Sequence, residues 1–288
     1  MADALSPAAV DRLSALLERF RVRAHWFHAG PLCGVTPFPA EPGRAFLHVL
    51  RRGRLEVTHP TGSGAPHRLT LCEPTLLLYP RALEHHFHHA LQEGSDFVCA
   101  TLAFDGGSRH PLVQALPAVL TLPIAQVDGI AQTLALLFAE TAQVRCGQRL
   151  LASRLFDVLL LQVLRWLLDH PAESGMPAGL LAGLAHPKLA RALTRMHERP
   201  GEAWSLAAMA QAAGMSRSAF AAEFRDTLGS TPGDYLLQWR VCVAQTWLHE
   251  GRPIQRISDA LGYASPAAFS RAFAQVVGAS PREWLKAQ

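Results

Sequence analysis

The sequence predicts an α+β protein in which a β-barrel precedes a helical segment and an all-α domain. Short apolar runs separated by proline and glycine fill residues 25–104, a pattern typical of an all-β barrel or sandwich. Apolar residues then recur with helical period over 127–170. From residue 186 onward the pattern is helical throughout, and this part of the chain contains two copies of one motif.

The predicted boundaries divide the 288 residues into three parts. Residues 1–125 form the β-barrel domain, which opens with a short amphipathic helix over residues 5–20. Residues 126–183 hold two helices and a linker at 171–183, where proline and glycine gather. Residues 184–288 form the all-α domain.

Composition excludes several classes of protein. Hydrophobic residues make up 49% of the chain and charged residues 17%, a globular balance that excludes wholesale disorder. The most apolar stretch, residues 158–168, is interrupted by Gln162 and Arg165 and is shorter than the ~20 residues of a membrane span. The N-terminus has no basic region followed by an apolar core, and five cysteines make no disulfide framework. These features predict a soluble cytoplasmic protein with no membrane partner.

Charge is distributed unevenly along the chain. Residues 1–180 hold 15 basic and 15 acidic residues, whereas residues 181–288 hold 12 and 8, so the net charge of +4 arises in the last part. Ten of the 14 histidines lie before residue 111. Because basic charge attracts polyanions and clustered histidines bind metals or sense pH, the two ends of the chain are expected to have different functions.

The last part of the chain contains two copies of a helix-turn-helix pattern. In the first copy Gly214 ends one helix, because glycine accepts left-handed dihedrals, and Ser216 caps the next. In the second copy Gly262 and Ser265 take these roles, with a turn one residue longer. The pairs that repeat at a spacing of 49 are Phe220/Phe269, Phe224/Phe273, Gly229/Gly278, Pro232/Pro281 and Tyr235/Trp284.

Each copy makes physical sense as a unit that binds the major groove of DNA. Two phenylalanines four residues apart face the core, which leaves the opposite face of the second helix free. A helix-turn-helix with a free outer face fits the major groove. A helix over residues 235–250 is expected to join the two units rigidly. The alternative is a helical bundle in which the repeat only packs a core.

These residues resemble the DNA-binding domain of the AraC/XylS family over roughly residues 186–288. The resemblance is carried by Gly-Met-Ser-x3-Phe-x3-Phe from Gly214 and by Leu-Gly-Tyr-x5-Phe-x3-Phe from Leu261, each followed by Gly-x2-Pro-x2-Tyr or Trp. It implies that two recognition helices enter successive segments of the major groove of double-stranded DNA. The residues it places at the DNA are Arg217, Ser218, Ala221, Ala222 and Arg225 in the first helix and Ser270 and Arg271 in the second.

The chain departs from the family pattern at Ala221 and Ala222, where longer polar residues are common. A methyl group can contact the methyl group of thymine but cannot read guanine. We therefore expect the second helix, through Arg271, to carry more of the base readout. Arg217 and Arg225 are expected to contact phosphates, which position the protein without specifying sequence. The alternative for each arginine is a solvated surface charge.

Residues 27–123 resemble the cupin-like sensor domain found in one branch of AraC-type regulators. The resemblance is carried by short stretches in the right order, such as Phe-His-Ala-Gly-Pro-Leu-Cys-Gly from Phe27 and Ala-Phe-Leu-His-Val-Leu from Ala45. It implies a small jelly-roll barrel whose interior can hold a ligand or a metal. It also implies that the helices at 127–170 form a homodimer.

Four residues of this barrel form a candidate metal site. His48 and Cys99 each share a strand face with apolar neighbours, so both can point into the barrel. With His85 and Cys33 they make a Cys2His2 set. Zinc is the candidate cofactor, because proteins commonly bind it with two cysteines and two histidines. A second interpretation is redox sensing by Cys99 and Cys33, since a thiolate near an imidazole or a metal oxidises readily. The alternative is an inert buried thiol and a core histidine.

The sequence as a whole predicts a sequence-specific transcription regulator that is not an enzyme. Its effector would be a small molecule, a metal ion or an oxidant, and RNA polymerase would be a further partner of an activator. One alternative is a cupin-type metalloenzyme, a dioxygenase or isomerase, although His48 lacks the usual His-x-His partner. A second alternative is an interaction protein that does not bind DNA, and its only support is the pair of alanines at Ala221 and Ala222.

Overall fold

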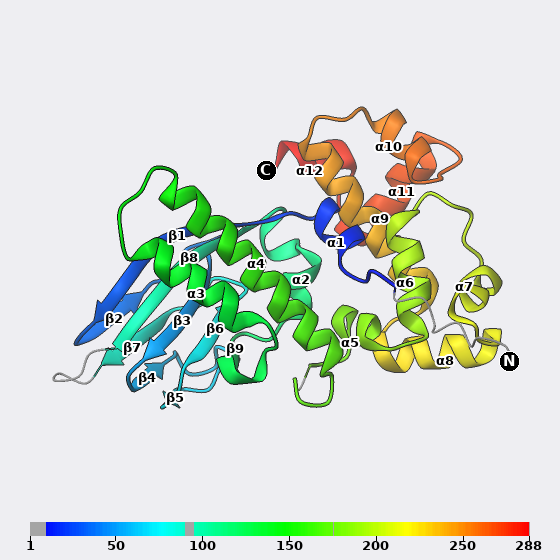
Figure 1. Cartoon of the computed structure of the whole chain (residues 1–288). Helices are drawn as coiled ribbons and strands as arrows, with labels where there is room; N and C mark the ends of the chain where they lie inside the picture. The colour runs from blue at the N-terminus through cyan, green and yellow to red at the C-terminus, as the bar shows by residue number, and fades with distance from the viewer. Residues whose placement is uncertain (1–9, 90–94, 175, 288) are drawn as a thin grey trace, which may run out of the picture. The chain divides into compact units, whose positions relative to one another are not determined.

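The structure is a computed structural model of the chain, and it describes residues 10–89, 95–174 and 176–287. These residues form two compact units (Figure 1). The barrel unit comprises residues 21–177, and the helical unit comprises residues 178–287 together with residues 10–20. The predicted division at 125 and 183 therefore differs from the observed one. The helices that follow the barrel belong to its unit, and the first helix of the chain belongs to the helical unit.

The barrel unit contains two antiparallel sheets, as the alternation of short strands and turns predicts. The first has the order β1-β8-β3-β6-β9 and the second β2-β7-β4-β5. Aromatic and aliphatic side chains from both sheets form the core, with Phe87 and Phe97 fully buried. The strands are β1 (Val22–Leu32), β2 (Val35–Phe38), β3 (Ala45–Arg52), β4 (Leu55–Thr58), β5 (Arg68–Leu71), β6 (Thr75–Tyr79), β7 (His85–His89), β8 (Ser95–Phe104) and β9 (Leu120–Pro123).

Among its described residues, the barrel unit also contains three α-helices, of which the last packs against β1 of the first sheet. α2 (Pro111–Ala115) precedes β9, and α3 (Ile130–Thr141) and α4 (Gln148–Asp169) pack against each other. The side chains of Asp157 and Ser153 on α4 accept hydrogen bonds from the backbone of β1, at 2.9 Å and 3.2 Å. α4 therefore completes β1, the edge strand of the first sheet, and belongs to the barrel unit (Figure 1).

The helical unit contains the two predicted helix-turn-helix pairs. The first pair is α7 (Leu206–Ala213) and α8 (Arg217–Leu228), and the second is α10 (Ile254–Ala260) and α11 (Pro266–Val277). α9 (Pro232–His249) joins them and begins three residues earlier than predicted, because Thr231 caps it and Pro232 occupies its first position. The other helices are α1 (Ser14–Arg19), α5 (Leu180–Ala185), α6 (Leu189–Glu198) and α12 (Pro281–Lys286).

α1 is a short helix that packs on the helical unit, although β1 of the barrel unit begins only three residues after it. Leu16 is fully buried, and the ring of Phe20 lies edge-on to that of Trp239 of α9, with 5.1 Å between centroids. The predicted helix over residues 5–20 is thus confirmed for Ser14–Arg19 and wrong for residues 10–13, which are not helical, while residues 1–9 lie outside the described part.

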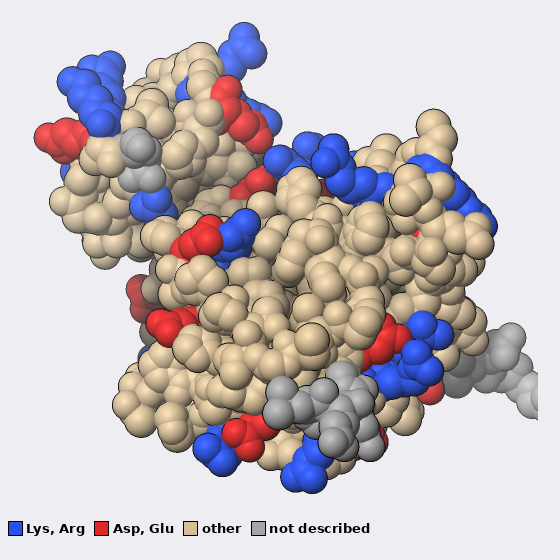
Figure 2. Space-filling view, turned by 90° about the vertical axis from the view of Figure 1, so that its left-hand side faces the viewer, with Lys and Arg blue, Asp and Glu red and all other residues tan. Residues whose placement is uncertain are grey.

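The surface agrees with the modest net charge. On the face that Figure 2 shows, acidic and basic side chains are interspersed among uncharged ones. Within the described residues, no helix combines the length and apolar character that crossing a membrane requires.

Candidate nucleic-acid interface and barrel interior

The first helix-turn-helix is built by its caps and its two phenylalanines. The Ser205 hydroxyl accepts a hydrogen bond from Ala208 N at 3.1 Å, and that of Ser216 accepts one from Ala219 N at 3.3 Å. Gly214 has φ +65°, which ends α7 in a conformation that glycine accepts readily. Phe220 and Phe224 are fully buried, so the opposite side of α8 is directed outward, as predicted.

The second helix-turn-helix repeats this construction. Ser265 caps α11 by accepting from Ala268 N at 3.2 Å, and Phe269 and Phe273 are fully buried. The seven residues predicted to face DNA all remain accessible in the described structure. Arg217, Ser218, Ala222, Arg225 and Arg271 are exposed, and Ala221 and Ser270 are partly buried.

Arg240 of α9 connects the two helix-turn-helix pairs within the helical unit, a role that the sequence did not reveal. Its guanidinium donates to the carbonyl oxygens of Pro200 at 2.7 Å and Glu202 at 2.9 Å, both in the loop before α7. The same group lies over the ring of Tyr263, in the turn between α10 and α11, at 5.5 Å. Burial lowers the pKa of Arg240, although the nearby Tyr263 partly offsets this effect. One side chain therefore connects the loop before α7 with the turn between α10 and α11.

A close backbone contact at the same place explains two glycines. A Cβ on Gly201 would lie 2.2 Å from the carbonyl oxygen of Ala260, and one on Gly262 would lie 2.1 Å from that of Gly201. Both distances are far below any van der Waals contact, so only glycine allows the loop before α7 to meet the turn after α10. This contact and Arg240 give the two recognition helices a defined separation.

The interior of the barrel holds a pair of buried histidines. The Nε2 atoms of His48 and His85 lie 3.2 Å apart, and His85 Nδ1 lies 2.8 Å from the carbonyl oxygen of Leu83. Because a carbonyl only accepts, His85 carries its proton on Nδ1, and its Nε2 accepts from His48. Burial is the main cause that lowers the pKa of both imidazoles, that of His85 to about 4. His48 Nδ1 then has no hydrogen-bond partner among the described residues.

A second buried pair, which the sequence did not indicate, adjoins the first. The ring of Tyr79 stacks on His85 with 3.9 Å between centroids, and its hydroxyl lies 3.0 Å from His59 Nε2. His59 Nδ1 donates to the carbonyl oxygen of Pro66 at 2.6 Å, so its Nε2 accepts from Tyr79. Burial raises the pKa of Tyr79, which keeps the phenol protonated as the donor. The rings of His48 and His85 are each surrounded by three phenylalanines, Phe38, Phe46 and Phe87.

The predicted zinc set is only partly brought together. His48 and His85 are in contact, and Cys99 on β8 is opposite His48 on β3 in the register of the sheet. Cys33 is exposed, and the described residues contain no group of three or more histidine, cysteine and acidic side chains that could hold a metal ion. Burial raises the pKa of Cys99, which disfavours its thiolate. The four-residue site and the redox role of Cys33 and Cys99 therefore stay predictions.

Comparison with known families and proteins divides the chain similarly, except that the first match includes α1. The Cupin family matches residues 11–169, and a helix-turn-helix domain family matches residues 209–287. A putative AraC-like transcription regulator of Streptomyces antibioticus is 35% identical over 187 residues, which are 64% of this chain and 61% of that protein. The RCS-specific HTH-type transcriptional activator RclR of Escherichia coli (strain K12) is 29% identical over 242 residues, 82% of each chain.

Two solved structures are also similar. The DNA-binding domain of AdpA in complex with a target DNA is 29% identical, covers 35% of this chain and 91% of its own, and has a TM-score of 0.33. Wild-type ToxT from Vibrio cholerae with a bound unsaturated fatty acid is 12% identical, covers 92% of this chain and 94% of its own, and has a TM-score of 0.40.

Proposed function

Because the chain belongs to the AraC family of transcription regulators, with a cupin domain before a helix-turn-helix domain, we propose that it binds promoter DNA through α8 and α11. In this proposal the exposed sides of the two helices enter successive major-groove segments, and the contact of the loop before α7 with the turn after α10 sets the spacing of the two half-sites. The observation that carries the proposal is the pair of matching helix-turn-helix units with accessible outer faces. Such a regulator acts where promoter DNA is, in the cytoplasm, and as an activator it would also contact RNA polymerase.

Selection from a random pool of duplexes tests the proposal directly. The full chain is expected to enrich one sequence with two half-sites about one helical turn apart, and its affinity for that sequence is expected to fall as salt rises. An enriched pool without a common sequence would contradict specific recognition. Binding of no duplex at low salt would favour the alternative of an interaction protein that does not bind DNA.

The barrel interior around His48 and His85 is the proposed place of effector sensing. An effector that favours one state of the barrel shifts the population of states that bind DNA.

The Nε2 atoms of His48 and His85, 3.2 Å apart, also fit two corners of a tetrahedral zinc site, because Zn–N bonds of about 2.0–2.1 Å place neighbouring nitrogens about 3.3 Å apart. Elemental analysis of the untagged full chain checks the metal. One zinc per chain that is lost in a Cys99→Ser variant supports the zinc set, and a metal-free chain rejects it.

A homodimer through α4 is the proposed assembly. Leu151, Val158 and Leu161 lie on one side of this helix and are 49%, 42% and 37% exposed. Exposed apolar residues at helical spacing favour contact with another apolar surface, and a second copy of α4 offers the same one. Two copies joined this way would bring four recognition helices to one promoter.

A further inference from the structure

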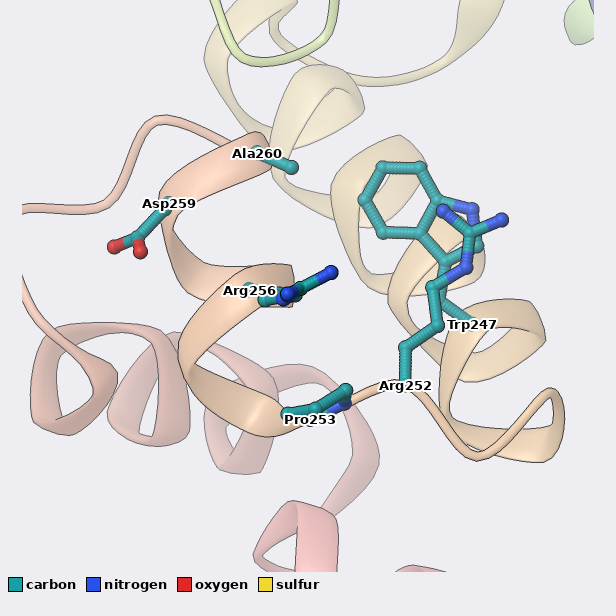
Figure 3. Close-up of a pocket in the computed structure, with 6 residues that line it drawn as sticks. All are labelled: Trp247, Arg252, Pro253, Arg256, Asp259 and Ala260. Atoms are coloured by element: carbon teal, nitrogen blue, oxygen red, sulfur yellow. The ribbon is translucent and has the colours of Figure 1, made fainter.

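A pocket lies at the start of the second helix-turn-helix, apart from the recognition helices. It has a volume of about 580 Å³ and lies between the end of α9 and α10 (Figure 3). Trp247 forms one wall, and Arg252 and Arg256 supply its cations. The guanidinium of Arg252 lies over the indole of Trp247 at 4.7 Å, and Arg256 is exposed on α10.

Two acidic residues accompany the two arginines, and one of them, Asp259, lines the pocket. The Asp259 carboxylate accepts two hydrogen bonds from the side chain of Gln255, at 2.9 Å and 3.1 Å, and points away from Trp247 (Figure 3). Glu250 pairs with Arg252 at 2.8 Å, but both side chains are about half exposed. An exposed ion pair of this kind is weak, so a phosphate can replace the carboxylate at little cost.

The internal repeat shows that these arginines are specific to the second unit. Before the turn the two copies are 48 residues apart, so Arg252 and Arg256 correspond to Trp204 and Ala208 in the first unit. α7 itself, Leu206–Ala213, carries no charged residue.

The recognition helices show the opposite distribution. After the turn the copies are 49 residues apart, so Arg217 and Arg225 on α8 correspond to Pro266 and Ala274 on α11. The second unit thus lacks cations where the first has its expected phosphate contacts. It has cations instead at the beginning of its first helix.

We propose that Arg252 and Arg256 form a clamp for the DNA backbone that anchors the second helix-turn-helix. In this motif the first helix crosses the backbone while the second lies in the groove, so cations at the start of α10 meet phosphates beside the segment that α11 reads. Trp247 holds Arg252 in place through its ring. The inference rests on the proposed function, since it names further contacts of the same DNA complex.

The test measures the salt dependence of DNA affinity for the full chain and its variants, with a short duplex of mixed sequence. Each phosphate contact contributes about 0.9 to the slope of log affinity against log salt. Arg256→Ala and Arg252→Ala are each expected to lower that slope by about 0.9 and the affinity by roughly fourfold near 0.2 M salt, for every sequence alike. Arg256→Lys is expected to keep the slope, because a phosphate accepts a point charge.

Arg282→Ala is the matched control, since Arg282 is exposed on α12 outside both helix-turn-helix units. Its slope is expected to equal that of the unchanged chain, and a slope lowered as in the clamp variants would overturn the inference. Unchanged slopes in both clamp variants would also overturn it, while salt-dependent binding by the original chain would leave the proposed function standing. If the original chain binds no duplex at low salt, the proposed function itself fails.

Discussion

At the scale of single residues, the outer faces of the two recognition helices differ in what they can read. α8 presents the methyl groups of Ala221 and Ala222, whereas α11 presents the exposed guanidinium of Arg271. A guanidinium can bond O6 and N7 of guanine together, and a methyl group can contact only the methyl of thymine. Discrimination among bases is therefore expected to depend more on α11 than on α8.

The first prediction concerns Arg271. Arg271→Ala is expected to weaken binding of the selected duplex by about 1–3 kcal/mol and to relax one base position. Repeating the selection with the variant measures both effects, and Arg282→Ala is the control. If the variant selects the same sequence as the original chain at every position, Arg271 reads no base.

The second prediction concerns the cysteines. Cys33, Cys72 and Cys146 are exposed, whereas Cys99 is buried and its burial raises the pKa of the thiol. A thiol reagent is expected to modify the exposed three rapidly in the folded chain and Cys99 only after unfolding, because the thiolate is the reactive form. Mass spectrometry of modified peptides identifies the sites. Rapid modification of Cys99 in the folded chain would favour its role as a redox sensor.

The third prediction concerns His197, which is fully buried against Trp239 and hydrogen-bonded to Tyr235 at 2.6 Å. Burial, and then the charge of Arg19, lower the pKa of His197 to about 3. The unfolded chain therefore takes up this proton first as pH falls below about 6.5, and stability is lost progressively until about pH 3. By pH 5 the loss is about 2 kcal/mol for this group.

Urea unfolding at several pH values, followed by tryptophan fluorescence, measures this loss. His197→Gln is expected to reduce the pH dependence between pH 6.5 and 5 by about this amount, and His249→Gln, at an exposed position, is the matched control. Equal pH dependence in the original chain and His197→Gln would show that this histidine does not titrate differently on folding.

At the scale of elements, α1 is the part of the chain whose partner is least expected from its position in the sequence. It precedes the barrel, yet its apolar residues pack on helices from the other end of the chain. Arg19 donates to the carbonyl oxygen of Glu198 at 3.5 Å, and its guanidinium lies 5.7 Å from the ring of Trp247. The helical unit therefore needs residues from both ends of the chain for its complete core.

The fourth prediction follows from this packing. Phe20 is 2% exposed, so Phe20→Ala is expected to destabilise the helical unit by about 3–5 kcal/mol. Hydrogen exchange measured by mass spectrometry is expected to rise in α6 and α9. Phe27→Ala is the matched control, because Phe27 belongs to the barrel unit and is 48% exposed. Unchanged exchange in α6 and α9 of the Phe20 variant would show that α1 adds nothing to this core.

At the scale of the whole molecule, the barrel unit has two covalent connections to the helical unit. The chain enters it at residue 21 and leaves it after residue 177. A change inside the barrel can therefore reach the helical unit at both ends, through β1, which follows α1, and through α4, which precedes the linker. Because α4 also carries the proposed dimer contact, sensing and assembly are expected to be linked.

The fifth prediction tests the dimer. Val158→Arg puts a charge in the middle of the exposed side of α4 and is expected to give a monomer, since an unpaired charge is costly in an apolar contact. Light scattering measures the mass of the full chain and the variant. Gln114→Arg, exposed on α2, adds the same charge elsewhere and is expected to leave the mass unchanged. A dimeric Val158 variant would place the assembly on another surface.

Local signals were enough to predict most elements of the fold. Caps, proline and glycine mark the ends of α7, α8 and α11, and the phenylalanines four residues apart mark the buried sides of α8 and α11. Short apolar runs and turn residues predicted an all-β barrel or sandwich over residues 25–104, although not each of its strands. These features depend on neighbours in the sequence, so a single chain reveals them. The accessible sides of α8 and α11 follow directly, because the position of the buried side determines the opposite one.

Three features were decided by tertiary structure alone. The pairing of His48 with His85, the hydrogen bond of His59 with Tyr79, and the connection by Arg240 of the loop before α7 with the turn after α10 each join residues distant in sequence. No local pattern encodes which strands face each other across a barrel or which loop a long side chain reaches. The sequence by itself determined the two helix-turn-helix units, the barrel and the family they form. Only packing decided that Cys33 remains outside the barrel core and that α1 joins the helical unit, because burial of apolar surface depends on the partners available in space.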